Sequence, residues 1–277
     1  MSGFANSYMN QTESYAFSEI YAESLNVTTV AELRDLSIDV LATGTGVSAF
    51  SGFQPTLDGY AIPYTYFESL LRGPVNDVPI IAGNNKDEDG ASTTTNVTYA
   101  EYIADTNTTY GKYADDFLSL YIATNDSTAD TATNARARDI ARVSTWLYAN
   151  SYARTATSDM YVYYWDHAPP GQTDGAFHAS EIPYVLNNLY GTDYPWESLD
   201  YSISDVLSSY WVNFIKSGNP NTGGSYAGGN LTQWNPSSNT SETAFHLGSS
   251  YGMVPLASEE QVQTIFDWFQ YAQPDPW

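Results

Sequence analysis

The sequence predicts an α/β fold with a mainly parallel sheet, and two kinds of pattern support this. Short apolar or aromatic runs such as "DVPIIAG" (77–83) and "DMYVYYW" (159–165) are typical of buried strands. Longer segments between such runs carry apolar residues at helical spacing, most clearly 129–156. Strands that alternate with helices indicate parallel connections. We expect residues 1–277 to form a single domain of this class.

Local patterns place the other elements. The first part of the chain predicts two helices within 13–41, broken at Asn26 to Thr29, followed by an irregular Gly- and Pro-rich stretch at 44–66. Further helices are expected at 98–123 (two short ones), 180–190, 203–216 and 258–272, with a loop at 217–230 and a short strand at 244–247.

The composition excludes several classes of protein. The net charge is −23, from 32 acidic and 9 basic residues, so the surface repels phosphate backbones and anionic lipid. We therefore expect neither nucleic-acid nor membrane-surface binding. No apolar run reaches the roughly 18 residues needed to span a bilayer. The high aromatic content of 15%, with 24 Tyr and 7 Trp, is not that of a disordered chain.

Sequons for N-linked glycans give some indication of location. The seven N-x-S/T sites are Asn10, Asn26, Asn96, Asn107, Asn125, Asn230 and Asn239. They favour an extracellular, secreted protein, although several would arise by chance in so Ser/Thr-rich a chain. The start "MSGFANSYMN" lacks the basic and apolar regions of a signal peptide. A secretory composition without a secretory start suggests that an upstream segment is missing.

The acidic stretch "NNKDEDG" raises the question of a metal site. Counted from Asn85 as position 1 of an EF-hand loop, Asp87 and Asp89 fall in register. Position 12, however, is Asn96 in place of the bidentate Glu, and a predicted strand precedes the loop where an EF-hand has a helix. There is no Cys for a disulfide or a Cys-based zinc site. We expect no metal and no cofactor.

Two interpretations of this acidic stretch remain open on local pattern alone. It can be a solvated turn, or it can hold a functional carboxylate, because it directly follows a predicted buried strand. Loops at the ends of sheet strands are where α/β enzymes place catalytic groups.

The three histidines differ in their surroundings. His246 lies in a strand pattern and His167 precedes two prolines, which favours a structural and a turn role respectively. His178 lies in "TDGAFHASEIPYVL", just before a predicted helix whose first turn accommodates Pro183. Local pattern alone slightly favours a structural or surface role for His178 as well, with catalysis as the alternative.

Several motifs in one order resemble a known family. "VPIIAGNNKDEDG" and "GAFHASEIPYVL" resemble the two downstream triad motifs of type B carboxylesterases, the α/β-hydrolase group that includes fungal lipases and cholinesterases. "FQPTLDGYAIPYTYFESLLRG" (53–73), "YWVNFIKSGNPN" (210–221) and "HLGSSYGMVPL" are similar to other segments of the family. The resemblance covers nearly the whole chain.

The resemblance implies residue roles. Glu88 would be the triad acid and His178 the general base, with the carboxylate fixing the tautomer of the imidazole. Asp87 and Asp89 would point elsewhere, to solvent or to backbone amides. Glu181 would orient the histidine loop without reacting.

The nucleophile implied by this resemblance is not found in its expected place. The fold has the order Ser, acid, His, so a G-x-S-x-G elbow should precede Glu88. "GTGVSAFSG" (44–52) has the wrong spacing. The literal match Gly248–Gly252 follows the histidine, and Pro255 prevents a helix from starting there, so we interpret it as a chance match.

The chain therefore resembles the C-terminal half of the α/β-hydrolase fold, with the N-terminal half, its serine and its oxyanion loop missing. We expect the chain alone to be inactive, with that half as its partner in cis or trans. The run "VPIIAG" would then present an unpaired strand edge, which predicts poor solubility or partial folding.

The leading hypothesis is a serine esterase or lipase that hydrolyses small-molecule or lipid esters. The alternative is a non-catalytic pseudoenzyme or adhesion module that uses the same fold. The presence of both an acid and a histidine favours the first. The sequence does not predict the acyl or alcohol preference, nor the oligomeric state.

Overall fold

The structure of the protein is a computed structural model, and two compact units are seen in it. Of the described residues, those from Gly73 to Ala272 belong to a large unit and those from Met9 to Arg72 to a small unit. The described residues are 9–43, 54–65, 68–69, 72–74, 76–88, 91, 96–223 and 228–272.

The small unit consists mainly of short helices. Strands β1 (Met9–Asn10) and β2 (Thr56–Leu57) pair in parallel, and the helices are α1 (Gln11–Ser24), α2 (Val30–Asp35) and α3 (Ile38–Leu41). The predicted break at Asn26 to Thr29 is confirmed. Thr29 caps α2 through the backbone amide of Glu32, and Ser37 caps a separate α3. Residues 44–53 of the predicted irregular stretch, "GTGVSAFSG" among them, lie outside the described residues.

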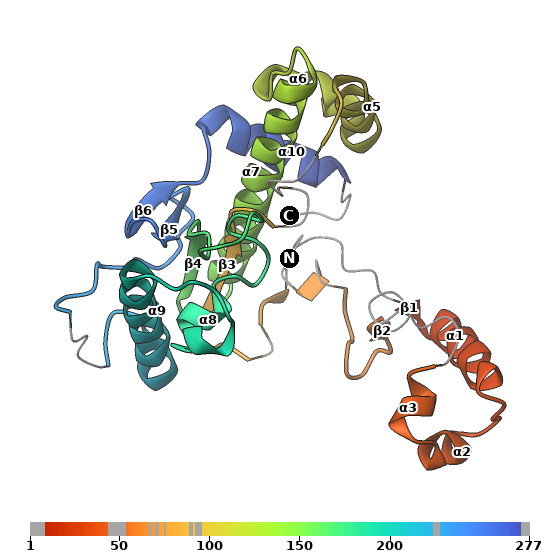
Figure 1. Ribbon diagram of the computed structural model, residues 1–277. Coiled ribbons are helices and arrows are strands. Elements are labelled where there is room, and N and C mark those ends of the chain that lie inside the picture. Colours follow the sequence, from red (N-terminus) through yellow and green to blue (C-terminus); the bar gives the residue numbers. More distant parts are fainter. Residues whose placement is uncertain are drawn as a thin grey trace. The chain divides into compact units, whose positions relative to one another are not determined.

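The large unit is built on a sheet of four strands in the order β3-β4-β5-β6 (Figure 1). The strands are β3 (Ile80–Asn85), β4 (Met160–Trp165), β5 (Thr243–Leu247) and β6 (Gly252–Pro255). The first three are parallel and β6 is antiparallel, so the predicted mainly parallel sheet is confirmed. Among the described residues β3 pairs with β4 alone. The sequence predicted β3 to end at Gly83, whereas the strand continues through Asn85.

Helices cover both faces of this sheet. Helix α7 (Asp126–Ala153) packs on one face and α9 (Ser198–Ser217) on the other. The other helices of the large unit are α5 (Tyr99–Tyr110), α6 (Ala114–Leu120), α8 (Ile182–Val185) and α10 (Glu259–Ala272). The predicted helix over 180–190 is wrong in length, since α8 has only four residues and a 3-10 turn follows at Leu189–Gly191. Asn187 adopts a left-handed φ of 50°, which no helix can continue through.

Alternation along β4 decides which helix each side chain meets. Tyr163 packs edge-on against Trp211 of α9, whereas the ring of its neighbour Tyr164 lies under the guanidinium of Arg142 on α7. The main core lies on the α9 face and joins Trp165 of the sheet to Tyr184 of α8. Other members of this cluster are Tyr161, Leu207, Tyr210, Trp234, Phe245 and Leu247.

One close approach in the sheet requires glycine. Gly83 pairs with Tyr163, and a Cβ atom at Gly83 would lie 2.3 Å from Cγ of that ring. Because the ring is held from the other side by Trp211, it has little room to move.

We predict that Gly83→Ala lowers the free energy of unfolding by about 1–3 kcal/mol, the usual cost of overpacking. Urea unfolding followed by tryptophan fluorescence measures it. Gly191→Ala is the matched control, because the nearest atoms there belong to the flexible side chain of Asn188 at 3.3 Å, and its effect should stay within about 0.5 kcal/mol. Equal stabilities for both variants would contradict the packing argument.

Candidate active site

A carboxylate and an imidazole meet beyond the carboxyl end of β3. Glu88 Oε2 lies 2.5 Å from His178 Nδ1, although the two residues are 90 positions apart in the sequence. The other carboxylate oxygen, Oε1, accepts the backbone N–H of Asn85 at 2.9 Å. The Glu88 side chain is largely covered, whereas the His178 side chain is 63% exposed. The contact expected between these two residues is confirmed, and their catalytic role stays a prediction.

Asp87 joins the acid turn to the histidine loop. Its backbone N–H donates to the carbonyl of Ala176 at 3.0 Å, and its Oδ2 accepts the N–H of Ala176 at 2.8 Å. Arg138 of α7 donates to Asp87 Oδ1 at 2.5 Å and to the carbonyl of Lys86 at 3.2 Å. The sequence predicted that Asp87 points to solvent or to backbone amides. The first alternative is wrong, because Asp87 is only 6% exposed, and the second is confirmed. Asp89 lies outside the described residues.

Asn85 anchors the residues on both sides of His178. Its side-chain Nδ2 donates to the carbonyl of Phe177 at 2.8 Å and to Glu181 Oε2 at 2.6 Å. Tyr163 donates its hydroxyl to the other oxygen of Glu181 at 3.3 Å. Burial, followed by the charge of Glu181, raises the pKa of Tyr163, so the phenol stays protonated and donates. Glu181 thus holds the loop that carries His178, as expected.

The histidine loop itself is tightly folded. The N–H of Ser180 donates to the carbonyl of Phe177 at 3.0 Å, and Ala179 adopts a left-handed φ of 69°. Such a conformation costs a non-glycine residue on the order of 1–3 kcal/mol, and surrounding contacts must hold it. One of these is the indole of Trp165, which donates to the hydroxyl of Ser180 at 2.9 Å.

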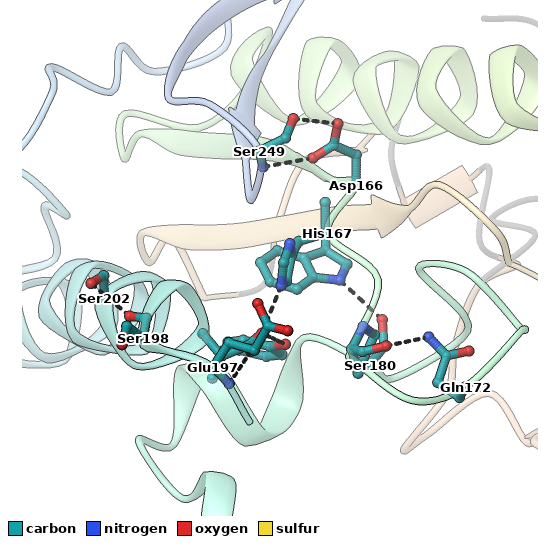
Figure 2. A network of polar contacts seen from close by, with 12 residues as sticks. Asp166, His167, Gln172, Ser180, Glu197, Ser198, Ser202 and Ser249 are labelled. Carbon is teal, nitrogen blue, oxygen red and sulfur yellow. Dashed lines mark hydrogen bonds and ion pairs between the residues drawn. The ribbon is translucent and has the colours of Figure 1, made fainter. Parts of the chain in front are cut away.

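His167 belongs to a network of polar contacts that also includes Ser180 of the histidine loop (Figure 2). Its Nε2 lies 2.8 Å from Asp200 Oδ1, and that oxygen also accepts the hydroxyl of Tyr184 at 2.7 Å. Burial disfavours the Asp200 carboxylate, but donation from His167, the backbone of Glu197 and Tyr184 outweighs it and holds the pKa of Asp200 below its usual range. The predicted turn role did not include this contact, through which His167 links the end of β4 to α9.

His246 and the literal G-x-S-x-G match lie together at the β5–β6 turn. His246 Nε2 is 2.9 Å from Asp166 Oδ2, and its Nδ1 is 2.7 Å from the hydroxyl of Ser250. Ser249 donates its N–H and hydroxyl to Asp166 at 2.9 and 2.7 Å, the paired contact at Asp166 in Figure 2. The segment enters strand β6 at Gly252, so the expectation that no helix starts there is confirmed.

Neither a metal-binding cluster nor a membrane-spanning helix is found in the described part of the chain. No group of three or more His, Asp or Glu residues there could hold a metal ion. Among the described helices none combines the length and apolar character needed to cross a bilayer.

The sequence did not single out Asn85 or Arg138. The polar pair Asn84-Asn85 at the end of an apolar strand is the signal that could have identified Asn85. The two side chains point to opposite faces, since Asn84 accepts from Thr145 of α7 at 2.5 Å. No local signal distinguishes Arg138 from Arg136 and Arg142 on the same helix.

Comparison with known proteins agrees with this architecture. The family model described as "Carboxylesterase family" matches residues 11–265. The chain belongs to the carboxylesterase family. Carboxylesterase 4A of Bos taurus is 29% identical over 133 residues, which make up 45% of this chain and 23% of that protein. Para-nitrobenzyl esterase of Bacillus subtilis (strain 168) is 28% identical over 183 residues, 61% of this chain and 35% of that protein.

A solved structure of PNB esterase shares the fold. The TM-score is 0.66 at 20% sequence identity, and the match covers 95% of this chain and 56% of that one. The large unit therefore has an α/β-hydrolase-like arrangement, a mostly parallel sheet flanked by helices. This carboxylesterase-family chain spans about half the length of the solved relative and smaller parts of the curated ones.

We predict that neutral His178 carries its proton on Nδ1 and donates a hydrogen bond from this N–H to Glu88. Long-range ¹H–¹⁵N correlation spectra recorded at alkaline pH distinguish the two tautomers of the neutral ring. In Glu88→Ala the population with the proton on Nε2 should rise, because the acceptor at Nδ1 is lost. His167 serves as an internal control that should not change. An unchanged His178 tautomer in Glu88→Ala would contradict the assignment.

Proposed function

We propose that this chain supplies the acid and the base of a serine-type carboxylic ester hydrolase. The observation that carries the proposal is the contact between Glu88 Oε2 and His178 Nδ1, with an exposed imidazole beyond the end of a parallel strand. Membership of the carboxylesterase family supports the choice of ester substrates. The serine would come from polypeptide outside these 277 residues, since no G-x-S-x-G precedes Glu88.

The proposed chemistry uses both nitrogens of His178. Glu88 accepts a hydrogen bond from the N–H at Nδ1 and stabilises the imidazolium, which leaves Nε2 free to take the proton of the serine hydroxyl. The serine oxygen attacks the ester carbonyl to form a tetrahedral intermediate, and when the bond to the alcohol oxygen breaks, His178 gives that proton to the leaving alcohol. Water then hydrolyses the acyl-serine through the same base, so no metal or organic cofactor is needed.

The surrounding residues would act on the position of the base. Asp87 and Asn85 hold the backbone at Ala176 and Phe177, directly before His178. The carboxylate of Glu181, which follows His178, accepts a hydrogen bond from the side chain of Asn85. A displacement of about 1 Å at a general base can cost on the order of 100-fold in rate. These three residues are therefore proposed as positioning residues.

A second candidate is a family member without hydrolytic activity. One match favours it: the inactive carboxylesterase-like protein VdtD of Byssochlamys spectabilis is 24% identical over 218 residues, 68% of this chain and 37% of that protein. The Glu88–His178 contact favours the hydrolase, because a binding module has no need for a base held by a carboxylate.

In the test, this chain is expressed together with the polypeptide that is encoded directly upstream of it in the longest transcript. A short-chain p-nitrophenyl ester and a fluorophosphonate probe measure turnover and serine labelling. We expect the joined protein to be labelled and to hydrolyse the ester, and His178→Ala to lower kcat by about 10³-fold or more. His246→Ala is the matched control, with unchanged kcat.

Two results would contradict the proposal. The first is ester hydrolysis by the 277-residue chain alone that His178→Ala abolishes, because this would place the nucleophile within the chain. A joined protein that folds but is neither labelled nor active would favour the non-catalytic candidate.

A further inference from the structure

Some of the described asparagines use the side-chain amide to hold the fold, and these differ from most of those that lie in N-x-S/T sites. In the described residues, the Nδ2 groups of Asn85, Asn187, Asn213 and Asn221 donate hydrogen bonds that hold the fold. None of these four is followed by Ser or Thr two positions later. All seven asparagines that lie in N-x-S/T sites are exposed. Asn107 differs from the other asparagines in N-x-S/T sites, because it lies inside α5 and its Nδ2 donates to the carbonyl of Ile103.

Asn125 shows how a modified amide fits the structure. It is the N-cap of α7, and its Oδ1 accepts the backbone N–H of Thr128 at 3.1 Å. Capping uses the carbonyl oxygen alone, whereas an N-linked glycan is attached at Nδ2. A glycan on Asn125 therefore leaves the cap intact.

Two further sites lie on the connection between α9 and β5. Asn239 occupies a tight turn whose ends, Ser238 and Ser241, form an isolated bridge. Asn230 follows Gly229, around which a Cβ atom would meet nothing within 4 Å. No hydrogen bond from Nδ2 of either asparagine is found among the described residues, and both side chains are on open surface.

We propose that Asn125, Asn230 and Asn239 are N-glycosylation sites. The Nδ2 atom of each forms a bond to C1 of an oligosaccharide supplied by a lipid-pyrophosphate donor. The bond from C1 to the phosphate oxygen breaks, and Nδ2 loses one proton to balance the departing lipid pyrophosphate. This proposal does not depend on the hydrolase function.

The test translates the full chain behind a cleavable signal sequence in the presence of microsomes. This assay counts glycans as steps in gel mobility that endoglycosidase removes, whether or not the chain completes folding. The variant combines Ser127→Ala, Thr232→Ala and Ser241→Ala, which destroy the three sites without altering an asparagine. The matched control combines Ser127→Thr, Thr232→Ser and Ser241→Thr, which keep them.

We expect the alanine variant to lose three endoglycosidase-sensitive steps relative to the wild type and the control to lose none. Peptide-N-glycosidase digestion in heavy-oxygen water, followed by mass spectrometry, assigns the sites. Equal mobility of the alanine variant and the wild type would overturn the proposal. A protease-protected wild-type chain without any endoglycosidase-sensitive step would overturn it as well.

Discussion

The candidate site depends on one buried carboxylate, that of Asp87. One oxygen accepts the N–H of Ala176 and the other accepts the guanidinium of Arg138, so the charge is paired and each oxygen has a donor. A buried charge of this kind is tolerated only with such partners, and removing one partner typically costs about 3–5 kcal/mol. The contact fixes the distance between the end of β3 and the segment that precedes His178. Glu88, the next residue along the chain, is thereby brought to the imidazole.

The two asparagines at the end of β3 point to opposite faces of the sheet. Asn84 turns towards α7 and Asn85 towards the histidine loop, as the alternation of a strand requires. Gly83 leaves room for the ring of Tyr163, whose hydroxyl reaches Glu181. The packing of the sheet and the position of the general base are thus parts of one arrangement. Tyr163 is the side chain that links the two, since its ring lies against Gly83 and its hydroxyl donates to Glu181.

Much of this could be predicted from the sequence, and the rest could not for physical reasons. Periodicity identified the parallel strands and the long helix, and the motif resemblance paired Glu88 with His178. The burial of Asp87 was missed because acidic residues in a turn are usually solvated. Its carboxylate is buried here because Arg138, from a helix distant in the sequence, pairs with it. The length of α8 was missed because the left-handed conformation of Asn187 is set by its tertiary surroundings.

The most direct measurement of the central claim is amide hydrogen exchange at Ala176, a residue with 0% exposure. In Asp87→Ala, exchange of the Ala176 N–H should accelerate by about 10- to 100-fold more than that of Val162 in β4, because a hydrogen bond to a charged group contributes about 1.5–3 kcal/mol. Equal acceleration at both amides, or none at Ala176, would show that Asp87 does not hold the histidine loop.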